Sequence, residues 1–250
     1  MNKLGVTLSG WELANPVIAA SGTFGFGHEF APWYDINILG SISLKGTTRE
    51  PRFGNPAPRI AECCGGMLNA IGLQNPGVKS VISQEIPDLR KVFKKKVIAN
   101  VAGFSVEEYV QVAALFDAVE EVALLEINIS CPNVKSGGMA FGSSAESASI
   151  VCREVKKVAK KPVYMKLSPN VANITEIAQA AEAAGADGLV LINTLLGMVI
   201  DPASGKPIVS TKMAGFSGPA IKPVALRMIY QVYSSVKIPI IGVGVILVQL

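Results

Sequence analysis

The residues of this chain with the most chemical potential stand at the ends of apolar segments. Cys131 lies in the motif Asn-Ile-Ser-Cys-Pro-Asn directly after one such segment, and Lys45 and Lys166 interrupt two others. Asn128 and Asn193 close apolar runs as well. A cysteine thiolate acts as a base or a nucleophile, lysines bind anions, and asparagine amides both donate and accept hydrogen bonds. This set of residues predicts the binding of a flat, anionic, amide-rich ligand.

Other chemistries lack the residues they need. The sequence holds one histidine, His28, to which we assign no role, and no paired carboxylates stand at the segment ends. Common hydrolase schemes need a histidine or paired acids and are therefore excluded, as is a sugar-phosphate isomerase. The four cysteines have no metal-ligand spacing, so no metal site is predicted. We expect Cys63, Cys64 and Cys152 to be small buried hydrophobes, with the alternative that Cys63 and Cys64 line the site.

Composition narrows the class of protein. Half of the 250 residues are hydrophobic, 17% are charged and the net charge is +4. The lysine clusters carry no interleaved aromatic residues, so no nucleic-acid partner is predicted. The first residues lack the apolar core of a signal peptide, and the final apolar run, residues 238–250, is shorter than the about 20 residues that cross a bilayer. We expect a cytoplasmic protein with reduced thiols and no membrane contact.

The elements that position these residues alternate between strand and helix. A hairpin is expected over residues 5–13, and amphipathic helices over residues 105–119, 144–159 and 173–184. Ser105 and Glu108 form a predicted capping box at the first helix. Apolar runs of strand length occupy residues 16–22, 42–48, 97–103, 124–132, 162–169, 188–194 and 238–244. The alternation predicts one α/β domain over residues 1–250, a (β/α)8 TIM barrel with its catalytic groups at the carboxyl ends of the strands.

Six sequence blocks carry a resemblance to a known family. They are ISLKGTT (42–48), NAIGLQNPG (69–77), NISCPNVKSGG (128–138), MKLSPN (165–170), LINT (191–194) and GFSGPAIKP (215–223). Together they resemble the catalytic subunit of class 1, B-type dihydroorotate dehydrogenases. The resemblance implies an FMN-binding barrel that oxidises dihydroorotate to orotate in pyrimidine synthesis, with a hydride passing to FMN. It further implies a homodimer associated with an iron–sulfur FAD electron-transfer subunit that passes the electrons to NAD.

The resemblance also implies a role for individual residues. Cys131 matches the catalytic base. The substrate-binding positions are matched by Lys45, Asn69, Gly72, Leu73, Asn128, Asn193 and Thr194. The FMN-binding positions are matched by Ser21, Lys45, Gly46, Asn100, Asn128, Lys166, Ile192, Gly218 and Gly244.

Several alternatives stay open at the level of sequence. Lys45 and Lys166 lie in apolar strands, where a structural ion pair is the other interpretation, and Glu126 needs a partner if it is buried. Residues 196–217 are expected to be a loop over the site. A dihydropyrimidine dehydrogenase-like flavin enzyme is the nearest alternative activity, and a non-catalytic truncated fragment is the alternative of another class.

The match to the family breaks after Gly244. Val245 stands where the family pattern has a further glycine, and the eighth strand and closing helix of the barrel do not follow. The intact blocks before this point lead us to expect a reading frame that is truncated or shifted there, and hence a barrel that is incomplete at its C-terminus.

Overall fold

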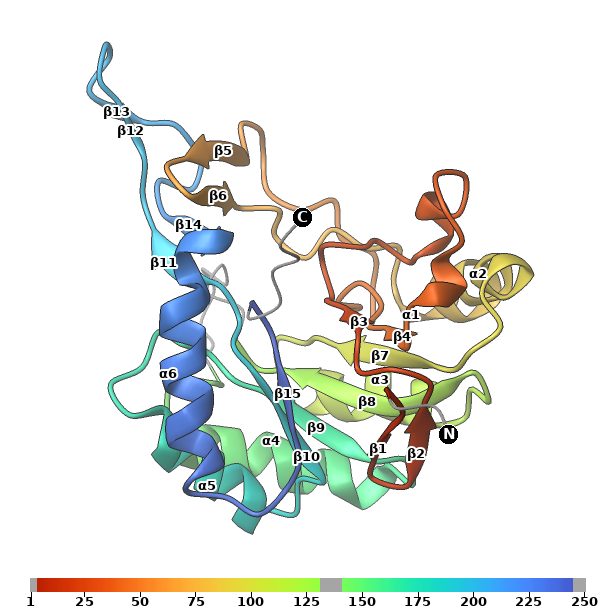
Figure 1. Ribbon diagram of the computed structural model, residues 1–250. Helices are drawn as coiled ribbons and strands as arrows, with labels where there is room; N and C mark the ends of the chain where they lie inside the picture. The colour runs from red at the N-terminus through yellow and green to blue at the C-terminus, as the bar shows by residue number, and fades with distance from the viewer. Residues whose placement is uncertain (1–3, 131–140, 245–250) are drawn as a thin grey trace.

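A sheet of parallel strands forms the centre of the molecule (Figure 1). The computed structural model describes residues 4–130 and 141–244. The five strands of this sheet lie in the order β15-β10-β9-β8-β7, and every neighbouring pair is parallel. Their bounds are β7 (Val97–Val101), β8 (Val122–Asn128), β9 (Val163–Lys166), β10 (Gly188–Leu191) and β15 (Ile240–Gly242).

Two further strands extend the sheet beyond β7. Strand β3 (Ile18–Ala19) pairs in parallel with β4 (Ser41–Ile42), and the chain after β4 continues along β7 through the parallel bridges Ser43–Ile98 and Thr47–Val101. Each of the seven predicted strand segments therefore overlaps an observed strand, in the predicted order, although β4 and β8 begin before their predicted segments and β4 shares only Ile42 with its own. In the part of the chain that the structure describes, β3 and β15 do not pair with each other, so the barrel is open between them.

Helices cover the outer face of the sheet, as the alternating pattern predicted (Figure 1). They are α3 (Val106–Asp117), α4 (Ala145–Val158), α5 (Ile174–Ala183) and α6 (Lys222–Tyr233), with α1 (Val78–Ser80), a π-helical turn (Val81–Glu85) and α2 (Ile86–Val92) before β7. Three short 3-10 turns, His28–Phe30, Ile36–Ile38 and Pro219–Ile221, complete the helical elements of the described residues. None of the helices in those residues is long and apolar enough to span a membrane.

The predicted capping box of α3 is only half formed. The Ser105 hydroxyl accepts a hydrogen bond from the backbone N–H of Glu108 at 3.2 Å, as a capping serine should. The Glu108 carboxylate does not return the bond to Ser105 as the box requires. It accepts instead from the backbone N–H groups of Phe104, at 2.8 Å, and of Arg49, at 3.2 Å. The carboxylate thereby joins the start of α3 to the chain that follows β4.

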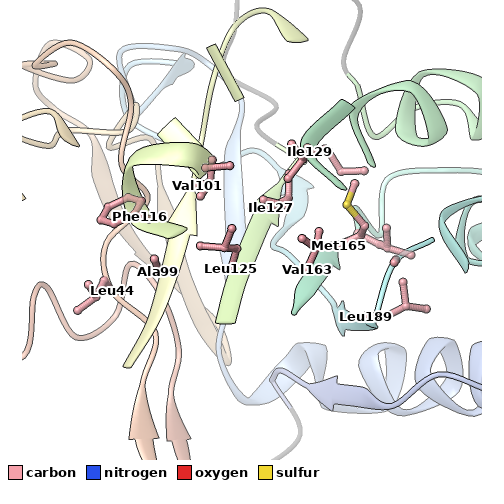
Figure 2. Packing of buried hydrophobic residues seen from close by; sticks show 14 of the residues in the cluster. Leu44, Ala99, Val101, Phe116, Leu125, Ile127, Ile129, Val163, Met165 and Leu189 are labelled. Carbon is pink, nitrogen blue, oxygen red and sulfur yellow. The ribbon is translucent and has the colours of Figure 1, made fainter. Parts of the chain in front are cut away.

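Alternate residues of each strand face two different cores. Leu125 and Ile127 of β8 pack outward against the helices, in a cluster that includes Phe116 of α3 (Figure 2). Leu124 faces inward, where it meets Ile98, Tyr164 and Val190 of the neighbouring strands. Trp11, from the hairpin β1 (Val6–Leu8) and β2 (Trp11–Leu13), packs against this inner cluster at one end of the barrel. The hairpin itself was predicted and is confirmed.

A second sheet is antiparallel and has four strands in the order β11-β14-β6-β5. The strands are β5 (Ile60–Cys63), β6 (Gly66–Asn69), β11 (Leu195–Gly197) and β14 (Ala214–Ser217), and the small hairpin β12 (Ile200–Asp201) and β13 (Lys206–Pro207) projects beyond it (Figure 1). The prediction of a loop over residues 196–217 was therefore wrong at both ends, which form β11 and β14, and in its interior, where β12 and β13 form a hairpin. Because β11 follows β10 by a few residues, this sheet lies over the carboxyl ends of the barrel strands.

Candidate active site

A layer of polar side chains crosses the interior of the barrel near the carboxyl ends of the strands. Glu126 of β8 stands opposite Asn100 of β7 in the strand register, and Lys166 of β9 stands opposite Asn128. The Lys166 ammonium lies 3.0 Å from Glu126 Oε1, and Asn100 Nδ2 donates to the same oxygen. Both charged residues are buried, at 4% and 3% exposure. Glu126 has the partner it was predicted to need, and the ion pair proposed as the alternative for Lys166 exists.

Two side-chain amides, of Asn128 at the end of β8 and of Asn193 just after β10, contact each other. Asn193 Nδ2 donates to Asn128 Oδ1 at 3.2 Å, and the same oxygen accepts from the backbone N–H of Ser130 at 3.3 Å. The Ser130 hydroxyl in turn donates to the carbonyl oxygen of Lys166 at 2.7 Å. These bonds fix the chain up to residue 130. Cys131, the predicted base, lies outside the described residues.

The segment after β4 brings Lys45 and Gly46 to the same layer. A Cβ atom on Gly46 would lie 2.8 Å from Asn100 Oδ1 and 3.2 Å from Leu73 Cδ2, so only a glycine lets these side chains approach the backbone here. The Lys45 ammonium lies 3.7 Å from where a Cβ of Gly22 would stand, which places the predicted Ser21 turn beside it. Asn100 Oδ1 and Ser43 Oγ are the buried side-chain polar atoms without a hydrogen-bond partner in the described part of the chain.

The predicted substrate residues other than Lys45 and Asn128 come from β6 and the turn after it and from the segment after β10. Asn69 ends β6, and its Nδ2 donates to the carbonyl oxygen of Gly215 in β14 at 3.4 Å. Gly72 and Leu73 follow with φ values of +77° and +56°, a left-handed turn that carries Leu73 to Gly46. Thr194 follows Asn193, whose Oδ1 accepts from the Thr194 backbone N–H at 2.8 Å. The turn after β6 thus meets the segment after β4 at Gly46, whereas Asn193 and Thr194 lie beside the end of β8 through the contact of Asn193 with Asn128.

The remaining predicted cofactor residues lie beside the start of α6. Gly244, with φ +80°, follows β15, and a Cβ there would touch Ile221 Cδ1 at 3.0 Å. Gly218, with φ +125°, precedes the same turn and packs against Gly66. Ile192 is buried at the end of β10, next to β15. No direct contact joins these glycines to Lys166 in the described residues, but a cavity in the barrel interior is lined by residues of both groups, among them Ser43, Glu126, Lys166 and Gly244.

The three described cysteines are free thiols that differ in burial. Cys152 is fully buried, as predicted, and burial raises the pKa of its thiol to about 11. The prediction of burial was wrong for Cys64, which is exposed, and for Cys63, which is half-buried. Both lie at the tight turn between β5 and β6, where Cys63 still packs against the small apolar cluster of this sheet. His28, which has no assigned role, contacts Glu85 Oε2 at 2.8 Å.

The sequence prediction missed two residues of the site. Glu126 was noted only as needing a partner, although its spacing of two residues from Asn128 places both on the inward face of β8. Tyr109 of α3 was not singled out, yet its hydroxyl donates to the carbonyl oxygen of Asn128 at 2.8 Å. A tyrosine inside an amphipathic helix gives no sign of this contact in the sequence.

Comparison with known proteins agrees with the geometry. The family model for dihydroorotate dehydrogenase matches residues 3–248. The chain is 59% identical over 241 residues to a protein of Bacillus pumilus (strain SAFR-032), covering 96% of this chain and 77% of the relative. It is 59% identical over 244 residues to one of Geobacillus sp. (strain WCH70), covering 98% and 78%. A third relative, of Bacillus mycoides (strain KBAB4), is 58% identical over 244 residues, covering 98% and 79%. All three bear the name dihydroorotate dehydrogenase B (NAD(+)), catalytic subunit. The chain therefore belongs to the dihydroorotate dehydrogenase family of oxidoreductases.

Proposed function

We propose that this chain is a single FMN-binding domain, residues 1–250, that oxidises dihydroorotate to orotate in pyrimidine synthesis. The observation that carries the proposal is the identity of 58–59% to catalytic subunits of that name over 96–98% of the chain. The polar layer inside the barrel supports it, because amides and ammonium groups there suit a ligand with amide edges and a carboxylate.

The residues at the strand ends fit a bound flavin mononucleotide. Asn100 Oδ1 is a buried acceptor without a partner among the described side chains, and Gly46, which has no side chain, lets this oxygen lie close to the backbone after β4. Lys45 and Lys166 supply cationic groups. Gly218 and Gly244 both have positive φ and lie near Ile221 at the start of α6, where backbone N–H groups suit a phosphate. Ser21, Asn128 and Ile192 complete the proposed FMN set. When bound, FMN supplies the acceptor for a hydride.

The substrate is held by amides at the carboxyl ends of β8 and β10, the two strands that flank β9. Asn128 and Asn193 already contact each other at 3.2 Å, so their remaining donor and acceptor atoms are held in fixed directions for the pyrimidine ring. Asn69 and Thr194 add polar groups, the turn at Gly72 and Leu73 closes one side, and Lys45 pairs with the carboxylate. These contacts orient the ring and exclude water from it.

Cys131 acts as the base. Its thiolate takes the proton from the ring carbon alpha to a carbonyl, while the hydride leaves the neighbouring carbon that bears the carboxylate. The C–C bond between them becomes the double bond of orotate. The anchored stretch of Asn128 and Ser130 supports this role, since it fixes the backbone that leads into Cys131.

We further propose a homodimer that works in the cytoplasm with an iron–sulfur FAD subunit, which passes electrons to NAD. The free thiols of Cys63, Cys64 and Cys152 suit a reducing compartment. The word "subunit" in the names of the relatives suits a partner chain.

A Cys131→Ser variant tests the proposal. Purified chain is titrated with FMN and assayed for orotate formation with an artificial electron acceptor, with dihydrouracil as the competing substrate. We expect the variant to lose about 10²–10⁴-fold in rate while its FMN affinity is retained. Cys64→Ser, on the exposed turn, is the matched control and should keep the full rate. A preference for dihydrouracil over dihydroorotate would favour the dihydropyrimidine dehydrogenase-like activity. Absence of FMN binding would favour a non-catalytic fragment.

A further inference from the structure

Glu126 is a buried carboxylate to which the proposed reaction assigns no part. It lies in the middle of β8, is 3% exposed and lines the interior cavity together with Lys166 and Ser43. Burying a carboxylate costs free energy unless it is paired, and a buried ion pair seldom stabilises a fold more than apolar residues of similar volume. Packing of the barrel therefore gives no reason for a charged pair at this position.

The contacts of Glu126 point to a reason. Its Oε1 atom accepts from Lys166 Nζ at 3.0 Å and from Asn100 Nδ2. Lys166 and Asn100 are both proposed FMN ligands, and they come from the two strands on either side of β8. One oxygen atom thus links two residues of the FMN set that do not follow each other in the sequence.

The carboxylate also fixes which way the Asn100 amide faces. An ionised carboxylate only accepts hydrogen bonds, so the amide must turn its Nδ2 toward Glu126. Asn100 Oδ1 then faces the Gly46 backbone, where it has no partner in the described residues. Without the carboxylate, the amide would be free to turn over and present a donor in place of an acceptor.

We propose that Glu126 is a positioning residue of the flavin site, which orients Asn100 and Lys166 and balances the positive charge of Lys166. This inference rests on the proposed function, because it concerns residues assigned to FMN. Reduced FMN carries more negative charge than oxidised FMN, so an unbalanced ammonium group nearby favours the reduced form. Glu126 thereby sets the relative affinity of the site for the two forms.

The test compares dissociation constants for oxidised and reduced FMN, measured by fluorescence titration and by anaerobic equilibrium dialysis. In Glu126→Gln we expect the ratio of the two constants to shift about tenfold toward reduced FMN, since the variant leaves Lys166 uncompensated. Lys166→Gln should shift the ratio in the opposite direction. The double variant restores the charge balance and should return the ratio to that of the wild type. If Glu126→Gln does not fold, Lys166→Gln compared with the double variant measures the same effect.

The matched control is Asp187→Asn. Asp187 also pairs with a lysine, Lys156, at 2.7 Å, but it lies at the opposite ends of β9 and β10. This variant should leave the ratio unchanged. If Glu126 only stabilises the fold, its variants change both dissociation constants by the same factor. A constant ratio would therefore overturn this inference and leave the proposed function untouched. A wild-type chain that binds neither form of FMN overturns the proposed function and this inference with it.

Discussion

The Tyr109 hydroxyl donates a 2.8 Å hydrogen bond to the carbonyl oxygen of Asn128, three residues before Cys131. The ring of the same tyrosine meets Phe141 edge-on, with centroids 5.6 Å apart. One side chain of α3 therefore contacts the described chain on both sides of the segment that carries the proposed base. Because Tyr109 is buried at 2% exposure, its position is set by the packing of α3 on β8.

Tyr109→Phe should lower the turnover rate while reducing the unfolding free energy only slightly. The variant keeps the ring and its contact with Phe141 but loses the bond to Asn128. We expect a loss of about 1 kcal/mol in unfolding free energy and a roughly tenfold lower turnover. Denaturant unfolding and the orotate assay measure the two effects. Tyr164→Phe is the control, since its hydroxyl bonds Ser9 at 3.0 Å beside the β1–β2 hairpin. Equal turnover losses in both variants would contradict a specific role for Tyr109.

Gly46→Ala should weaken FMN binding without unfolding the chain. The new Cβ would stand 2.8 Å from Asn100 Oδ1 and 3.2 Å from Leu73 Cδ2, so the amide must move. Overpacking of this kind costs about 1–3 kcal/mol, and we expect the FMN dissociation constant to rise at least about tenfold. Fluorescence titration with FMN provides the measurement. Gly205→Ala serves for comparison: its φ of +67° strains an alanine, but nothing lies within 4 Å of its Cβ position, so this variant should lose some stability and keep its FMN affinity. Unchanged FMN affinity in Gly46→Ala would show that Gly46 and Asn100 do not belong to the FMN site.

The barrel was predictable from sequence because its strands are buried on both faces. Such strands appear as continuous apolar runs, and β7, with every residue buried, lies inside its predicted segment. The antiparallel sheet was not predictable. Its strands have three or four residues and are half exposed, and β6 pairs with β14 across a long separation in sequence. Short strands of this kind carry no periodic pattern that distinguishes them from a loop.

The site, like the fold, was predictable from the sequence only in part. That polar residues would converge at the strand ends follows from barrel topology, and the contact of Asn128 with Asn193 confirms it for these two residues. Which residue pairs with which depends on strand register and rotamers, so neither the choice of Lys166 as the partner of Glu126 nor the contact of Asn100 with Glu126 was visible in the sequence.

Asn193→Ala should raise the KM for dihydroorotate. The variant removes a proposed substrate contact and leaves Asn128 Oδ1 with one donor fewer. A lost hydrogen bond of this kind costs about 1–3 kcal/mol, so we expect KM to rise about tenfold to a hundredfold. Asn173→Ala is the matched control, because Asn173 caps α5 by accepting from the Thr175 N–H, and its loss costs about 1 kcal/mol in stability. A KM increase of the same size in the control would show that the effect comes from stability alone.

The raised pKa of the buried Cys152 thiol should make the fold less stable at alkaline pH. Burial raises the pKa of its thiol from the ordinary 9.0 to about 11, since no solvent stabilises the thiolate. Between these two pKa values the unfolded chain has released the proton and the folded chain has kept it. The unfolded state therefore binds fewer protons, and the unfolding free energy falls as pH rises above about 9. At about pH 10.5 the loss due to this thiol should reach about 2 kcal/mol.

Urea unfolding of the wild type and of Cys152→Ala, at pH 8 and about pH 10.5, measures this loss. The variant should be less stable than the wild type at pH 8, because the buried side chain is truncated, and the gap should narrow by about 2 kcal/mol at the higher pH. The pKa of Tyr164 is also raised by burial, but this tyrosine is present in both proteins, so the difference between them isolates Cys152. A gap that stays constant with pH would mean that the thiol titrates equally in the folded and unfolded chain.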